Sequence, residues 1–118
     1  MRRLIKVNQI LNKGLVLATE ISIDDLAREI AAGSYVLDVR EDDEWAEGHV
    51  PTAVHIPLGQ LEARISEVED GGRVFVICRS GVRSQKGAAI LFANGLDAVS
   101  VAGGTMGWIA AGKDVVTP

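Results

Sequence analysis

Short apolar runs alternate along the chain with longer segments in which apolar residues recur at helical spacing. Each run is three or four residues long and is followed by polar, Gly or Pro residues, which is typical of buried strands. The runs lie at 35–37, 53–56, 74–77 and 98–101, and a further short strand is expected at 19–21. The run at 74–77 is the most apolar and is therefore expected at the centre of a sheet.

Helices are predicted between these strands. Ser22 is expected to cap a helix that continues through Leu26 and Ile30, with Asp25 three positions after the cap and Gly33 at the end. Further helical segments are predicted at 41–47, 57–65, 84–94 and 105–111. Strands that alternate with helices imply an α/β fold of three layers, in which a mostly parallel sheet has helices on both faces.

The composition fits a single globular domain. The chain has 118 residues, of which 47% are hydrophobic and 4% aromatic, so an aliphatic core is expected. The formal net charge is −4, which argues against a general nucleic-acid binder. Positive charge is local, at Arg79, Arg83 and Lys86. The start of the chain is basic, but Lys6 and other polar residues interrupt its apolar run, so we expect neither an export signal nor a membrane span.

Cys78 is the only cysteine. A lone thiol excludes an internal disulfide and a cysteine-rich zinc site, and a reducing, cytoplasmic location is expected. Cys78 follows a strand and precedes a helix, where free backbone amides and the helix dipole stabilise a thiolate. The flanking Arg79 and Arg83 are expected to act in the same way. A buried core cysteine is the alternative, which the charged neighbours disfavour.

Three segments, in this order and spacing, closely resemble the rhodanese domain. They are Asp38-Val39-Arg40 with Glu44-Trp45 and Gly48-His49-Val50-Pro51; Cys78-Arg79-Ser80-Gly81-Val82-Arg83-Ser84; and Gly103-Gly104 with Trp108. The resemblance covers roughly Glu20 to Gly112. It divides the chain into an N-terminal extension (1–18), a rhodanese-like domain (19–113) and a C-terminal tail (114–118). One departure is Thr52, since this position is usually glycine in the family.

The resemblance implies a parallel sheet of about five strands and a sulfurtransferase that carries sulfur as a persulfide on Cys78. The surrounding loop would bind the anion through Arg79, Ser80, Gly81, Val82, Arg83 and Ser84. Successive amides of a tight loop form such an anion site, and Gly81 is expected at positive φ. The donor would be thiosulfate or another small persulfide, and the acceptor cyanide, a thiol or a protein. Neither a metal nor an organic cofactor is required.

The length of the loop separates this chemistry from that of cysteine-dependent phosphatases. Four residues lie between Cys78 and Arg83, whereas phosphatases use five, so a smaller cradle is expected. A phosphatase or an arsenate reductase is therefore disfavoured, the latter also because there is no second thiol. A sulfur-relay or regulatory module that binds a protein without turnover remains the main alternative. Oligomeric state is left open.

The other polar residues of the motifs are expected to support the site. Asp38 and Arg40 are interpreted either as a structural ion pair or as support behind the site, with Glu44 as a candidate third member. His49 is interpreted as a residue that holds its loop by hydrogen bonds. A general base is not needed where the thiol is already ionised, so neither His49 nor His55 is assigned that role.

Overall fold

The computed structural model describes residues 19–118. These residues form one five-stranded sheet in the order β1-β5-β4-β2-β3, and every pairing is parallel. The strands are β1 (Glu20–Ile21), β2 (Tyr35–Asp38), β3 (Val54–His55), β4 (Val74–Ile77) and β5 (Ala98–Val101). The central strand β4 is buried along its whole length, as its sequence predicts.

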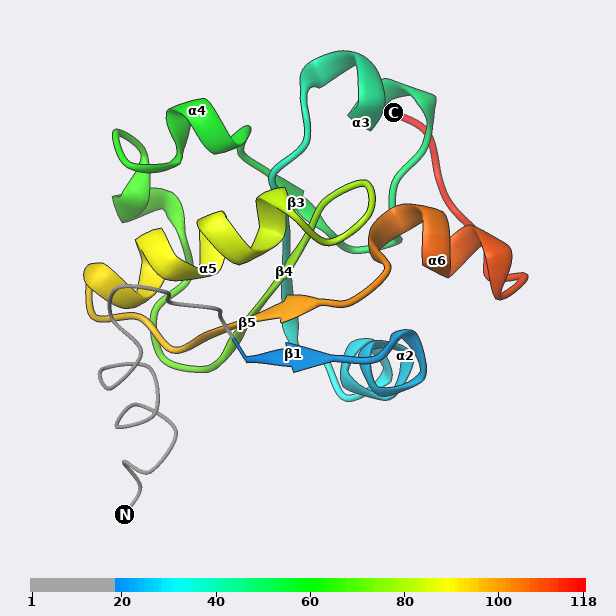
Figure 1. Ribbon diagram of the computed structural model, residues 1–118, viewed down its shortest axis with the longest axis horizontal. Helices are drawn as coiled ribbons and strands as arrows, with labels where there is room; N and C mark the ends of the chain where they lie inside the picture. The colour runs from blue at the N-terminus through cyan, green and yellow to red at the C-terminus, as the bar shows by residue number, and fades with distance from the viewer. Residues whose placement is uncertain (1–18) are drawn as a thin grey trace.

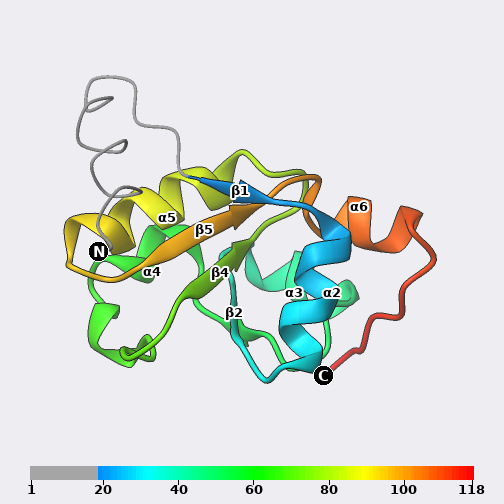
Figure 2. The ribbon, with the colours of Figure 1, turned by 90° about the horizontal axis from the view of Figure 1, so that it is seen from below.

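Helices cover both faces of the sheet, as Figures 1 and 2 show. The helices are α2 (Ile23–Ala31), α3 (Asp42–Glu47), α4 (Leu58–Leu61), α5 (Arg83–Ala93) and α6 (Gly104–Ala110), with a 3-10 turn, η1 (Ile65–Glu67). Helices α4 and α5 pack together on one face, and α2 and α6 lie together on the other. The predicted three-layer α/β fold is confirmed.

Two aliphatic clusters hold these layers together. Because successive strand residues point to opposite faces, Val36 and Leu37 belong to different clusters. Leu37 packs with residues of α4 and α5, whereas Val36 packs with Leu26 of α2 and Trp108 of α6. Trp108 is thus a buried packing residue of the second cluster.

The predicted elements agree with the structure to within a few residues at their ends. Ser22 caps α2 through a hydrogen bond that its side chain accepts from the amide of Asp25, at 3.1 Å. The largest departure is the segment predicted as one weak helix at 57–65. It forms a single α-helical turn, α4, and then the separate 3-10 turn η1. The predicted N-terminal extension, 1–18, lies outside the described residues.

The last residues are docked on the domain. His49 and Val116 pair as an antiparallel bridge, in which each amide donates to the other's carbonyl at 2.9 Å. The Trp108 indole N–H donates to the Asp114 carbonyl at 2.7 Å. The segment 114–118, predicted as a tail, therefore helps to fix the loop that follows α3. In the described part of the chain, every helix is too short or too polar to cross a bilayer.

Candidate active site

Cys78 lies directly after β4, at the carboxyl end of the sheet, and its side chain is 1% exposed. Although the residue joins the aliphatic cluster beneath α5, its sulfur meets polar partners. The Gly81 amide donates to Cys78 Sγ at 3.1 Å, and Sγ lies 3.4 Å from Ser84 Oγ. The sulfur is thus buried at the base of the loop that joins β4 to α5, which we call the anion loop (residues 79–84).

These contacts determine the acidity of the thiol. Burial raises the pKa of Cys78, because an apolar environment disfavours the thiolate. The Ser84 hydroxyl and the amides of Ser84, Gly81 and Ser80 lower it, and they prevail, so the pKa lies below its ordinary value of 9.0. The lowering comes principally from hydrogen bonds to the sulfur and not from the charges of the flanking Arg79 and Arg83.

Ser100 extends this network and was not singled out from the sequence. Its Oγ lies 2.7 Å from Ser84 Oγ, and both hydroxyls are fully buried. When Ser84 donates its proton to the thiolate, Ser100 can donate to Ser84 in turn, which strengthens the first hydrogen bond. The feature of the sequence that could have pointed to Ser100 is that it is the one polar residue in the otherwise apolar strand predicted at 98–101.

Two glycines allow the backbone to close around the cysteine. Gly81 has φ +112°, the conformation expected for it from the sequence. A Cβ atom at Gly104 would lie 2.5 Å from the carbonyl oxygens of both Cys78 and Arg79. The bare backbone of Gly104 therefore lets α6 approach the anion loop, where the Thr105 amide donates to the Cys78 carbonyl at 2.8 Å.

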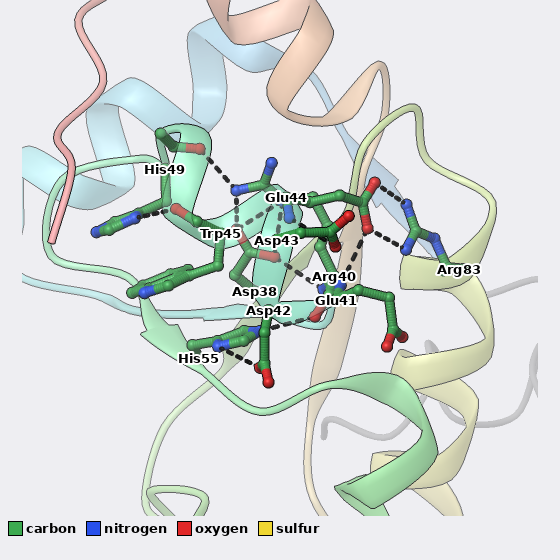
Figure 3. Close-up of polar contacts among 11 residues, drawn as sticks. Asp38, Arg40, Glu41, Asp42, Asp43, Glu44, Trp45, His49, His55 and Arg83 are labelled. Atoms are coloured by element: carbon green, nitrogen blue, oxygen red, sulfur yellow. Dashed lines mark hydrogen bonds and ion pairs between the residues drawn. The ribbon is translucent and has the colours of Figure 1, made fainter.

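The two arginines of the anion loop have different environments. Arg83 forms a bidentate ion pair with Glu44 of α3, at 2.7 and 2.8 Å, as Figure 3 shows. Its guanidinium is therefore bound to a carboxylate in this structure, and the role in anion binding expected for Arg83 stays a prediction. Through this ion pair Arg83 also ties the loop to α3. Its hydrogen bond lowers the pKa of Glu44 from 4.5 to about 2.

Arg79 is exposed, and within residues 19–118 its side chain has neither an ion pair nor a hydrogen bond. It is therefore the arginine of the anion loop that is available to an incoming anion. Ser80 and Val82 are exposed as well. Among the described residues, no group of His, Cys, Asp and Glu side chains has the arrangement of a metal site.

Asp38 and Arg40 form the ion pair expected from the sequence. The Arg40 guanidinium donates to both carboxylate oxygens of Asp38, at 2.8–3.0 Å, and to the Gly48 carbonyl at 2.8 Å. Both side chains are buried. The pair holds the end of β2 against the loop after α3, and Glu44 is not part of it (Figure 3).

The two histidines are structural in this arrangement. His49 Nδ1 lies 3.0 Å from the Trp45 carbonyl, which agrees with the loop-holding role expected for it, and His55 Nε2 lies 2.7 Å from the Arg40 carbonyl. The two rings stack on opposite faces of the Trp45 indole in Figure 3, with centroids at 3.4 and 4.7 Å from it. Neither His49 nor His55 is hydrogen-bonded to the Cys78 sulfur, so neither is positioned here as its general base.

The rhodanese-like domain model matches residues 22–111, which is most of the chain. The chain belongs to the rhodanese-like domain family. Its departure at Thr52 now has a physical reading: Thr52 has φ +73°, a conformation that favours glycine, and it is the one residue other than glycine with positive φ among residues 19–118.

This rhodanese-like domain is similar to its relatives over most of their length. It is 41% identical over 91 residues to YtwF of Bacillus subtilis, whose name assigns it provisionally to the sulfurtransferases; the match covers 75% of this chain and 88% of YtwF. It is 32% identical over 105 residues to a sulfurtransferase of Allochromatium vinosum, covering 86% of this chain and 98% of that protein.

A solved structure supports the same grouping. A rhodanese-related protein of Thermoplasma volcanium superposes with a TM-score of 0.79 at 35% identity, covering 85% of this chain and 99% of that one. Together with the sulfurtransferase relatives, this likeness supports a sulfurtransferase or sulfur-carrier function for the rhodanese-like domain.

Proposed function

We propose that this domain transfers sulfane sulfur through a persulfide on Cys78, from thiosulfate or another small persulfide donor to a thiophilic acceptor. The observation that carries the proposal is the position of the Cys78 sulfur beneath the anion loop, with an amide at 3.1 Å and a hydroxyl at 3.4 Å. A thiolate held in this way is both a nucleophile and a carrier.

In the first step, the Cys78 thiolate attacks the outer sulfur of thiosulfate. A new S–S bond forms, the S–S bond of thiosulfate breaks, and sulfite leaves with the electron pair. The anionic outer sulfur of the persulfide accepts hydrogen bonds from the amides of the loop. Arg79, which is free of other partners in the described structure, binds the departing oxyanion.

In the second step, an acceptor attacks the outer sulfur. The Cys78–sulfur bond breaks and Cys78 leaves as a thiolate, which restores the starting state. With cyanide as the acceptor, the product is thiocyanate. The cycle is balanced without a redox cofactor, because the sulfur atom carries its own oxidation state from donor to acceptor.

The test combines turnover with mass measurement. We expect thiosulfate alone to add one sulfur atom to the intact protein, cyanide to remove it as thiocyanate, and Cys78→Ser to abolish both. Thiocyanate production by the Cys78→Ser variant would refute the assignment. A mass gain without turnover would favour the relay module instead, and hydrolysis of an aryl phosphate would revive the phosphatase.

A further inference from the structure

A cavity of about 160 Å³ lies beside the anion loop, between α6, the end of α3 and the docked C-terminal segment. Its walls include Arg40, Arg79, Thr105, Met106, Ile109 and Val115. The volume matches roughly five water molecules, so it suits a ligand of a few non-hydrogen atoms. None of the contacts described above for the Cys78 sulfur involves these side chains.

Thr105 supplies the first sign that this cavity is built for a ligand. The residue is 3% exposed, and its Oγ1 is the one buried side-chain polar atom without a hydrogen-bond partner in the described chain. A buried hydroxyl without a partner is costly, so such a group calls for an explanation. The amide of Thr105 donates to the Cys78 carbonyl at 2.8 Å, so the part of the cavity wall that Thr105 forms is anchored to the backbone of the nucleophile.

The charges of the cavity favour an anionic group on the ligand. Arg79 lines the cavity and has no partner within residues 19–118, whereas Arg40 is already bound to Asp38 and Gly48. Glu47 also lines the cavity and would repel a second negative charge. A ligand with a single negative charge placed at Arg79 would pair with the guanidinium and would bring no second charge near Glu47.

The remaining wall is apolar. Met106 and Ile109 project from successive turns of α6 and are 49% and 51% exposed. With Val115 they offer a short hydrocarbon surface opposite the charged side. Exposed apolar side chains beside a polar, partly enclosed site fit the body of a small organic ligand.

We propose that this cavity binds the carboxylate end of a small thiol that accepts sulfur from Cys78. The proposal rests on the proposed function. The acceptor thiolate attacks the outer sulfur of the persulfide, a new S–S bond forms, the bond to Cys78 breaks, and Cys78 leaves as a thiolate. The donor has already departed at this stage, so Arg79 can serve the sulfite oxyanion first and the carboxylate afterwards.

Binding is tested first, without any sulfur transfer. Butyrate has the length of a short mercapto acid but no thiol, and butyramide is its uncharged control. In heteronuclear NMR of the full chain, we expect butyrate to shift the amide signals of Thr105, Met106 and Ile109 saturably, and butyramide to shift them weakly. Absence of a saturable shift with butyrate would overturn the proposal, whether or not the domain turns over thiosulfate.

Transfer is tested on protein that already carries the persulfide, so that the donor step does not enter. The acceptors are 3-mercaptopropionate and its amide, compared as the ratio of their second-order rate constants for removing the persulfide in a single turnover of each variant. We expect the wild type to prefer the acid, and Arg79→Gln to lower that preference about tenfold, the worth of one charge-assisted hydrogen bond. Thr105→Val should lower the preference, and Thr105→Ser, which keeps the hydroxyl, should retain it.

The outcomes are distinct. Equal use of acid and amide by the wild type would overturn the acceptor role, even where butyrate binds. Failure to form a persulfide from thiosulfate would count against the proposed function instead, and the butyrate titration would then decide the cavity alone.

Discussion

The ion pair between Glu44 and Arg83 ties the anion loop to α3 and should be measurable as stability. The pair is bidentate, at 2.7 and 2.8 Å, and its side chains are 18% and 30% exposed. Replacing Glu44 by Gln keeps the size of the side chain and removes its charge. We therefore expect Glu44→Gln to destabilise the fold at neutral pH.

The magnitude follows from the pKa of Glu44, which its hydrogen bond with Arg83 lowers from 4.5 to about 2. A shift of this size corresponds to about 3 kcal/mol, at about 1.4 kcal/mol per pH unit. Because both side chains are partly exposed, solvent screening reduces the expected loss to about 1–2 kcal/mol.

The pH dependence has a definite sign. Since the pKa of Glu44 is lower in the folded than in the unfolded state, its contribution is fully present above pH 4.5 and is lost as the pH falls through about 2. In urea unfolding, the difference between the free energies of unfolding of the wild type and Glu44→Gln should therefore be largest at pH 7 and fall to about half at pH 3.

A matched control is Glu67→Gln, which breaks the pair with Arg64. Those side chains are 52% and 36% exposed, so this change should leave stability nearly unaltered at both pH values. The reasoning is refuted if Glu44→Gln is no more destabilising than Glu67→Gln. It is also refuted if the loss of unfolding free energy caused by Glu44→Gln is the same at pH 7 and pH 3.

Three further substitutions test the site and its frame. Ser84→Ala should raise the pKa of the Cys78 thiol, measured by the pH dependence of alkylation, because it removes the hydroxyl at 3.4 Å that lowers this pKa; an unchanged pKa would contradict the network. Thr52→Gly should stabilise the fold by about 1 kcal/mol in urea unfolding by relieving φ +73°; destabilisation would show that the conformation is not strained. Gly104→Ala should destabilise the fold, since a Cβ at Gly104 meets backbone at 2.5 Å. The control Gly59→Ala, in α4 with nothing within 4 Å of the added Cβ, should leave stability unchanged or raise it; similar effects of the two changes would refute the close approach.

Much of the fold follows from local patterns. The five predicted strands are all present in the structure, and Ser22 caps α2 as predicted. The candidate cysteine was identifiable because a lone thiol stood between a strand and a helix. These features depend on neighbours in sequence, to which periodicity and capping rules apply.

The features that were missed depend on contacts between distant segments. Glu44 and Arg83 are 39 residues apart, so their ion pair could not be predicted from neighbouring positions in the sequence. Ser84 meets Ser100 only because β4 and β5 are neighbours. The partnerless hydroxyl of Thr105 likewise depends on how α6 packs against the anion loop.

The central claim is that hydrogen bonds from the loop lower the pKa of the buried Cys78 thiol and so favour its thiolate. Because Cys78 is the only cysteine, the ultraviolet absorbance of the thiolate, followed against pH in the intact protein, reports on this group alone. The account predicts a transition below the ordinary pKa of 9.0. A transition at or above 9.0 would contradict it.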